Sequence, residues 1–177
     1  MTITKHRYKV ICHAAKCGIL WQGLRHDLSK YSPAEFWVGA KNWLGNRSPN
    51  ENERLEKGYS VAWMHHKGRN KHHFEYWCDY HPETHLMTPV EMPHKYLIEM
   101  FCDRVAASKI YMGKDYNDTA PLAYFMKEKK RRVIHPKTSL KLEYLLTMLA
   151  NDGEKKTFKF IKSYKKGFEV PENFTGN

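Results

Sequence analysis

Glycine and proline residues divide this 177-residue sequence into segments of ordinary helix length. The clearest start is Ser32-Pro33-Ala34-Glu35, where a serine N-cap, a proline and a glutamate three residues after the serine form a capping box. Pro93 opens a long segment that Gly113 ends. No stretch alternates between polar and apolar residues as a half-buried strand does. The sequence therefore predicts an all-α protein, a single-domain bundle of about seven helices.

The expected helices follow this punctuation, with Gly45 and Gly68 as additional stops. The first is capped by Thr2 or Thr4 and ends before Gly18, and the next lie near residues 20–28, 32–44, 51–66 and 93–112. Two or three more follow near residues 120–132, 138–151 and 154–166. Residues 67–92 are expected to be long and partly irregular, and the tail after Gly167 loosely held. We expect residues 1–115 to form a metal-binding helical core and residues 116–177 to add basic helices on the same domain.

Size and composition favour one cytoplasmic domain. A chain of this length can bury a substantial core. It has no run of about 18 apolar residues, which a membrane span needs, and its start lacks the apolar core of a signal peptide. The four cysteines have no CxxC spacing, which indicates buried free thiols.

The chain is strongly basic, with a formal charge of +11 and a pI near 9.4. The excess is spread along the sequence, with local runs at residues 127–132 and 155–166. Such a charge favours anionic partners, either phosphate-containing small molecules or nucleic acid. A solvated basic surface without a partner is the alternative interpretation of the two runs.

The histidines are concentrated around a His-Asp dipeptide, and ten of the eleven lie within residues 1–94. His26 and Asp27 follow an apolar helical segment, and an adjacent imidazole and carboxylate can ligate one metal centre or bridge two. Lys30 lies about one helical turn further, where it could reach an oxyanion at that metal. Four more histidines lie within residues 65–73.

Two other segments offer ligands on one helix face each. His6 and His13 are seven residues apart, and Glu99 and Asp103 are four apart. A carboxylate such as Asp103, among apolar neighbours, is costly to bury unless it is paired or ligates a metal. Imidazole and carboxylate donors without thiolate suit one or two ions of Mn, Fe, Co, Ni or Zn.

In this order the motifs resemble the HD superfamily of metal-dependent phosphohydrolases. His26-Asp27-Leu28-Ser29-Lys30 is similar to its His-Asp element, and Asp103 to its closing aspartate. His6, four residues before Val10, fits the helix-one histidine better than His13 does. The longer motifs resemble a small, functionally uncharacterised bacterial and phage branch. They are HDLSKYSPAEF from His26 and AWMHHKGRNKHHFEYW from Ala62. One departure is Leu28-Ser29, where members often carry Ile-Gly.

The resemblance implies hydrolysis of a phosphomonoester or phosphodiester, for example a nucleotide. One metal would be held by His6, His26, Asp27 and Asp103. A second would share Asp27 and take ligands from His66, His72 and His73, with His65 the remaining candidate. Asp27, Lys30 and Arg69 would act on the substrate, Arg104 being a further phosphate contact, and Asn70 and Glu75 would orient imidazoles.

Two other functions fit the same sequence. Some HD-like proteins hold a di-iron pair and oxidise their substrates with O2, and the histidine-rich set would suit iron. A non-catalytic basic domain that binds nucleic acid or a nucleotide would need no catalytic metal.

Overall fold

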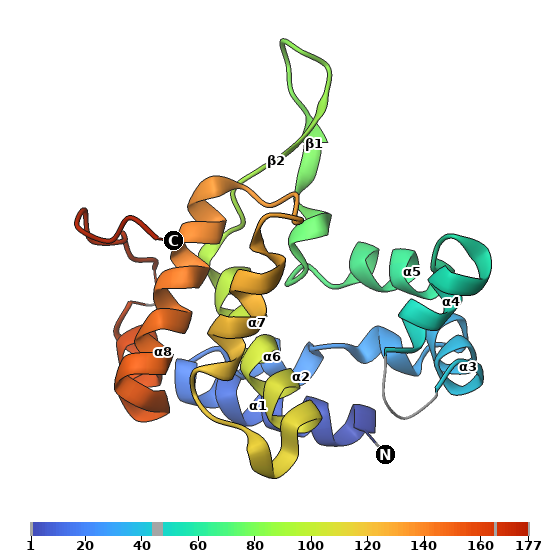
Figure 1. The fold of residues 1–177 in the computed structure, drawn as a ribbon, viewed down its shortest axis with the longest axis horizontal. Coiled ribbons are helices and arrows are strands. Elements are labelled where there is room, and N and C mark those ends of the chain that lie inside the picture. The colour runs from blue at the N-terminus through green and yellow to red at the C-terminus, as the bar shows by residue number, and fades with distance from the viewer. Residues whose placement is uncertain (1, 44–47, 165, 177) are drawn as a thin grey trace. The chain divides into compact units, whose positions relative to one another are not determined.

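The computed structural model describes residues 2–43, 48–164 and 166–176, and these are mostly helical (Figure 1). This confirms the all-α prediction. The chain separates into two compact units. Unit 1 comprises Met1–His26 and His72–Asn177, and unit 2 comprises Asp27–Lys71. The helices expected beyond residue 115 belong to unit 1, together with the first helix and the helix that Pro93 opens.

Unit 1 contains five α-helices, two short 3-10 turns and one hairpin among the described residues. The helices are α1 (Thr2–Cys17), α2 (Leu20–Arg25), α6 (His94–Met112), α7 (Ala120–Lys129) and α8 (Pro136–Ser163). The turns are η2 (Phe74–Tyr76) and η3 (Gly113–Asp115), and the strands are β1 (Cys78–Tyr80) and β2 (Met87–Pro89). The predicted bounds of α1 and α6 are correct to within about one residue.

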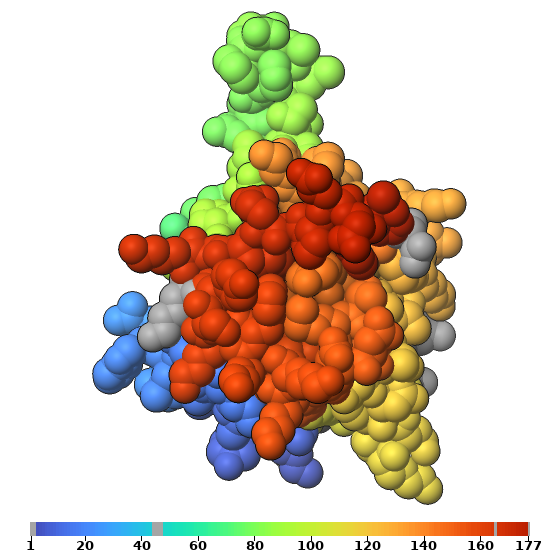
Figure 2. Space-filling model, turned by 90° about the vertical axis from the view of Figure 1, so that its left-hand side faces the viewer, coloured from blue at the N-terminus to red at the C-terminus, as the bar shows by residue number. Residues whose placement is uncertain are grey.

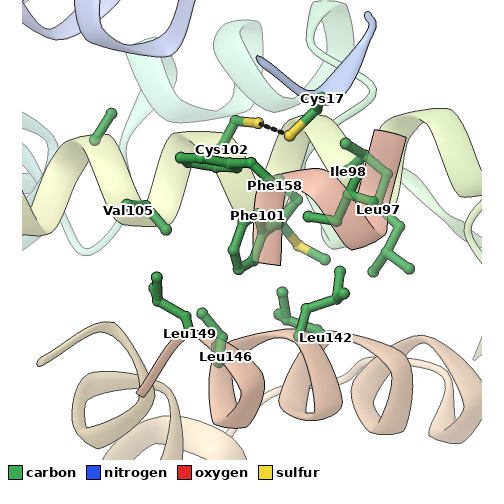
Figure 3. Packing of buried hydrophobic residues seen from close by; sticks show 14 of the residues in the cluster. Cys17, Leu97, Ile98, Phe101, Cys102, Val105, Leu142, Leu146, Leu149 and Phe158 are labelled. Carbon is green, nitrogen blue, oxygen red and sulfur yellow. Dashed lines mark hydrogen bonds between the residues drawn. The ribbon is translucent and has the colours of Figure 1, made fainter. Parts of the chain in front are cut away.

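The apolar core of unit 1 lies along α6. Phe101 and Val105 face the leucines of α8, among them Leu146 and Leu149 (Figure 3). In Figure 2, α8 and the C-terminal segment form the broad face toward the viewer. On another side of α6 the Sγ atoms of Cys17 and Cys102 lie 3.6 Å apart, both buried as free thiols. Every residue of the buried apolar cluster belongs to unit 1.

Of two predictions about the C-terminal region, one is confirmed and the other needs correction. The two helices expected at 138–151 and 154–166 are both present, because α8 consists of two helical segments separated at Gly153, whose backbone is not helical (φ 76°, ψ 171°). The tail is not loose throughout, because Phe168 is buried against Tyr144 and Phe160. An aromatic side chain can anchor a segment that has no regular structure.

The segment expected to be irregular contains an antiparallel hairpin, which the sequence analysis missed. Strands β1 and β2 pair Cys78 with Pro89 and Tyr80 with Met87, and the hairpin projects from the helices of its unit (Figure 1). Its strands are three residues long, too short for alternation to be recognised.

Unit 2 contains η1 (Leu28–Tyr31), α3 (Pro33–Lys41), α4 (Pro49–Lys57) and α5 (Val61–Arg69). The single helix expected over 51–66 is therefore wrong. Gly58, in the left-handed conformation (φ 81°), ends α4, and the Ser60 hydroxyl caps α5 by accepting from the Trp63 amide. Helix α5 continues through Gly68, and the expected stop at Gly45 lies outside the described residues.

Helices α1 and α2 approach each other closely at a glycine. A Cβ atom on Gly23 would lie 2.5 Å from the Cβ of Ala14. The Arg7 guanidinium, on α1, donates to the carbonyls of Leu24 (2.9 Å) and His26 (2.8 Å) at the end of α2. Packing and hydrogen bonds together fix the position of His26 against α1.

None of the helices in the described ranges has the length and apolar character required to cross a bilayer.

Candidate metal centre

Glu99 of α6 contacts two histidines, each through its Nδ1 atom. Its Oε1 accepts from Nδ1 of His26 (2.9 Å) and Nδ1 of His72 (3.1 Å), and its Oε2 accepts from the Gln22 amide. The side chains of Glu99, His26 and His72 are all buried. Because Nδ1 of each ring is engaged, Nε2 is the nitrogen left to face the next carboxylate.

That carboxylate is Asp103, one helical turn further along α6. Its Oδ1 lies 2.9 Å from Nε2 of His6 and 3.6 Å from Nε2 of His26, and its Oδ2 lies 4.0 Å from Nε2 of His72. Three imidazoles from separate segments therefore converge on one carboxylate. His26, His72 and Glu99 also form a group whose possible ligand atoms lie within 4.8 Å of one another.

The histidines keep both carboxyl groups ionised. Burial raises the pKa of Glu99, but the hydrogen bonds from His26 and His72 outweigh it and lower this pKa to about 2. Burial opposes ionisation of Asp103 too, and the contacts with His26 and His6 nevertheless hold its pKa well below the usual value. A cluster of anionic oxygens and imidazole nitrogens is a suitable donor set for a divalent transition metal.

The structure separates His6 from its competitor His13. His13 is buried two turns away, where its Nδ1 donates to the Cys102 carbonyl (3.3 Å) and its ring packs against Phe158. Burial lowers the pKa of His13 to about 4. His6, which contacts Asp103, is therefore the α1 histidine placed at the candidate centre.

Unit 2 contains a second cluster, centred on Asp27. This residue has a left-handed backbone (φ 55°) and is buried. Its Oδ2 lies 2.6 Å from Nζ of Lys30, and its Oδ1 lies 3.3 Å from Nε2 of His66. Lys30 thus contacts the Asp27 carboxylate itself, and its predicted contact with an oxyanion at the metal stays a prediction.

Glu35 has a different role from the one expected. Ser32 forms no side-chain cap, and the Glu35 carboxylate instead accepts from Nδ1 of His65 (2.6 Å) and Nδ1 of His66 (2.7 Å). Burial raises the pKa of Glu35, but these imidazole contacts lower it overall. The Asn70 amide donates to the Ser29 hydroxyl and to the His66 carbonyl, which holds the same helix end.

The two clusters share one arrangement. In each, a glutamate accepts from Nδ1 of two histidines. An aspartate lies near Nε2 of both histidines in unit 1 and near Nε2 of one of the two, His66, in unit 2. Glu99 and Asp103 do this in unit 1, and Glu35 and Asp27 in unit 2. The two boundaries between the units fall at members of these clusters, because the first segment of unit 1 ends at His26 and its second segment begins at His72.

The remaining predicted residues differ in their surroundings. Arg69 is exposed, with its side chain directed at the His65 carbonyl. The ring of His73 lies 4.1 Å from that of His72, centroid to centroid. Arg104 lies beside Phe125. The roles of these residues in catalysis and in a second metal site stay predictions.

Sequence reasoning missed the two glutamates. The spacing of Glu99 and Asp103 was recognised, but only Asp103 was selected as a ligand. Glu35 was assigned to a capping box with Ser32, and that role accounts for a glutamate at this position without any histidine contact. The available signal was the four-residue spacing to Asp103 in one case, and the neighbouring His65-His66 pair in the other.

The fold and the site define an all-α protein with buried histidine–carboxylate groups that could hold a metal ion. Residues 1–148 match a family described as Family of unknown function (DUF5662), and the chain belongs to that family. No curated protein and no solved structure gave a significant match.

Proposed function

We propose that this protein is a metal-dependent phosphohydrolase that acts on phosphate esters such as nucleotides. The observation that carries the proposal is the convergence of His6, His26 and His72 on Asp103, with Glu99 engaging the far side of two of the rings. A purely structural ion-pair network has little need for three imidazoles presenting the same nitrogen to one carboxylate. The motif resemblance to HD phosphohydrolases agrees with this chemistry.

The residues of unit 1 would hold the metal through Nε2 of His6, His26 and His72 and through the Asp103 carboxylate. A divalent ion supplies Lewis acidity toward a phosphoryl oxygen and makes bound water more acidic. Glu99 positions two of the imidazoles. In unit 2, Asp27 and His66 offer the same donor types, and the Lys30 ammonium can neutralise an anionic oxygen.

Metal content and hydrolysis test the proposal together. The protein is purified without chelator or immobilised metal and analysed for transition metals, beside Asp103→Asn, Glu99→Gln and the control Asp79→Asn, an exposed acid in the hairpin. We expect one or two equivalents in the wild type and in the control. Asp103→Asn should lose the metal, and Glu99→Gln should weaken metal binding by about 10- to 100-fold.

Activity is measured on nucleotides, cyclic dinucleotides and a nitrophenyl phosphate, and it should follow metal content across the variants. Iron with O2-dependent turnover would replace the proposal with oxygenase chemistry. A metal-free wild type that stays empty after reconstitution, or a metal-loaded protein inert on the whole panel, would refute it.

A further inference from the structure

Two arginines share one buried aromatic ring in unit 1. Arg104 directly follows Asp103 on α6, and Arg132 follows the end of α7. The guanidinium carbon of each lies 5.9 Å from the centre of the Phe125 ring, which is fully buried. Arg132 also lies 5.5 Å from the Tyr124 ring and 5.9 Å from the Phe74 ring.

These guanidinium groups lack hydrogen-bonding partners within the described parts of the chain. Nε of Arg104 and Nη1 of Arg132 are buried, and neither side chain donates to a described residue. Ion pairs within 4.0 Å are likewise absent for both among the residues described. Aromatic faces attract the cations, but a ring offers no strong acceptor to the buried N–H groups at Arg104 Nε and Arg132 Nη1.

The nearest negative charges do not remove this deficit. Glu75 and Asp103 lie close enough to attract Arg104, whereas the positive charge of Arg132 repels it. Asp103 is already engaged by His6 and His26. The Oε2 atom of Glu75 is buried, and no residue in the described ranges donates a hydrogen bond to it.

Two partly buried cations packed on the same ring are unfavourable unless an anion joins them. Each buried N–H that loses water without gaining an acceptor costs free energy, and the two positive charges repel each other. A tetrahedral oxyanion solves both problems, because a guanidinium presents paired donors that match two oxygens of a phosphate group.

We propose that Arg104 and Arg132 form an oxyanion-binding site for a phosphate group, with the Phe74, Tyr124 and Phe125 rings holding the guanidinium planes. Two links connect this arginine pair to the candidate metal centre. Arg104 is the neighbour of Asp103, and Phe74 follows His72-His73 in sequence. The assignment of the anion as part of the substrate rests on the proposed function, whereas the binding site itself does not.

Binding of inorganic phosphate to the chelator-treated, metal-free protein tests the site. Titration calorimetry is done in buffer free of phosphate and sulfate, with Arg104→Met, Arg132→Met and the matched control Arg131→Met. The Arg131→Met variant removes the same charge from a neighbouring position, but the side chain of Arg131 is 79% exposed. We expect the control to bind as the wild type does, and each of the other variants to bind at least about 10-fold more weakly.

Thermal unfolding supplies a readout that does not depend on the calorimetric signal. Without an anion, Arg132→Met should unfold at a higher temperature than the wild type, because it removes a partly buried charge that repels Arg104. Added phosphate should raise the melting temperature of the wild type but not that of this variant.

Absence of phosphate binding by the metal-free wild type would overturn the proposal. So would equal weakening in Arg131→Met and Arg132→Met, which would indicate diffuse surface charge. If phosphate binds as expected but no metal can be loaded, the phosphohydrolase assignment fails and the arginine site stands.

Discussion

At the scale of single residues, the candidate centre depends on which nitrogen of each histidine is engaged. His26 and His72 both meet Glu99 through Nδ1 and Asp103 through Nε2. Sequence motifs predicted His6, His26 and Asp103 at one metal and His72 at a second, and the structure places all three histidines near the Asp103 carboxylate. The role of Glu99 could not be predicted, because spacing shows that two acids share a face but not which of them supports the imidazoles.

His13 should make the stability of the protein depend on pH. Its folded-state pKa is about 4, below the unfolded value of 6.5, so the unfolded chain binds a proton first as the pH falls. Stability is therefore lost as pH drops below about 6.5, amounting to about 2 kcal/mol by pH 5. In urea unfolding, we expect His13→Asn to lose about 2 kcal/mol less stability between pH 7 and pH 5 than the wild type does. Asparagine keeps a donor for the Cys102 carbonyl.

The comparison needs a histidine that is not buried. His85, exposed in the hairpin, provides it as His85→Asn, and its positive φ (54°) is one that asparagine tolerates. The prediction is wrong if the pH dependence of His13→Asn parallels that of the wild type and of the control.

At the scale of elements, strong punctuation predicted helix positions well and tertiary contacts decided the rest. Pro93 and Gly113 bracket α6 as expected. The division between α4 and α5 was missed because Gly58 was not recognised as a left-handed helix end. The hairpin was unpredictable for a different reason, because three-residue strands are too short to show alternation.

Helices α4 and α5 are joined by a buried carboxylate. Glu53 is fully buried, and it accepts from the Ser60 hydroxyl (2.7 Å), the Ala62 amide (3.3 Å) and the Lys57 ammonium (3.2 Å). Glu53→Gln should destabilise this helix pair by about 1–3 kcal/mol at pH 7, because one acceptor oxygen becomes a donor facing donors. Hydrogen exchange of amides in residues 49–69 measures the effect locally.

Glu56→Gln, at an exposed position of the same helix, is the control and should exchange as the wild type does. Burial raises the pKa of Glu53, but its donors lower it overall, so its contribution is present above pH 4.5 and is lost on acidification. Equal exchange in both variants and the wild type at pH 7 would contradict the assigned role.

At the scale of the whole molecule, the two units have interiors of different character. The buried apolar cluster lies in unit 1, whereas the buried residues described in unit 2 are mostly polar, including Glu35, Glu53 and His66. The chain leaves unit 1 at His26 and returns at His72, and their rings lie 4.3 Å apart. Unit 2 is thus inserted into unit 1 between two residues that lie close together. The prediction of individual helices from sequence cannot reveal such an arrangement.

Unit 1 should consequently fold without unit 2. Replacing residues 27–71 with a short Gly-Ser linker should leave a helical protein with cooperative thermal unfolding, because its core is complete. The isolated peptide of residues 27–71 should be largely unfolded, since it lacks a comparable apolar core. Circular dichroism with thermal melts tests both. A molten unit 1, or a cooperatively folded peptide, would show that the division is wrong.

The close contact between α1 and α2 has a consequence for how the sequence can vary through evolution. Any side chain at Gly23 would collide with Ala14 and push away the end of α2, which carries His26. Selection that preserves the histidine cluster must then preserve this glycine as strictly as the histidines, although it has no functional group. Among descendants of this gene, drift at position 23 should be accompanied by reshaping of the α1 surface beneath it.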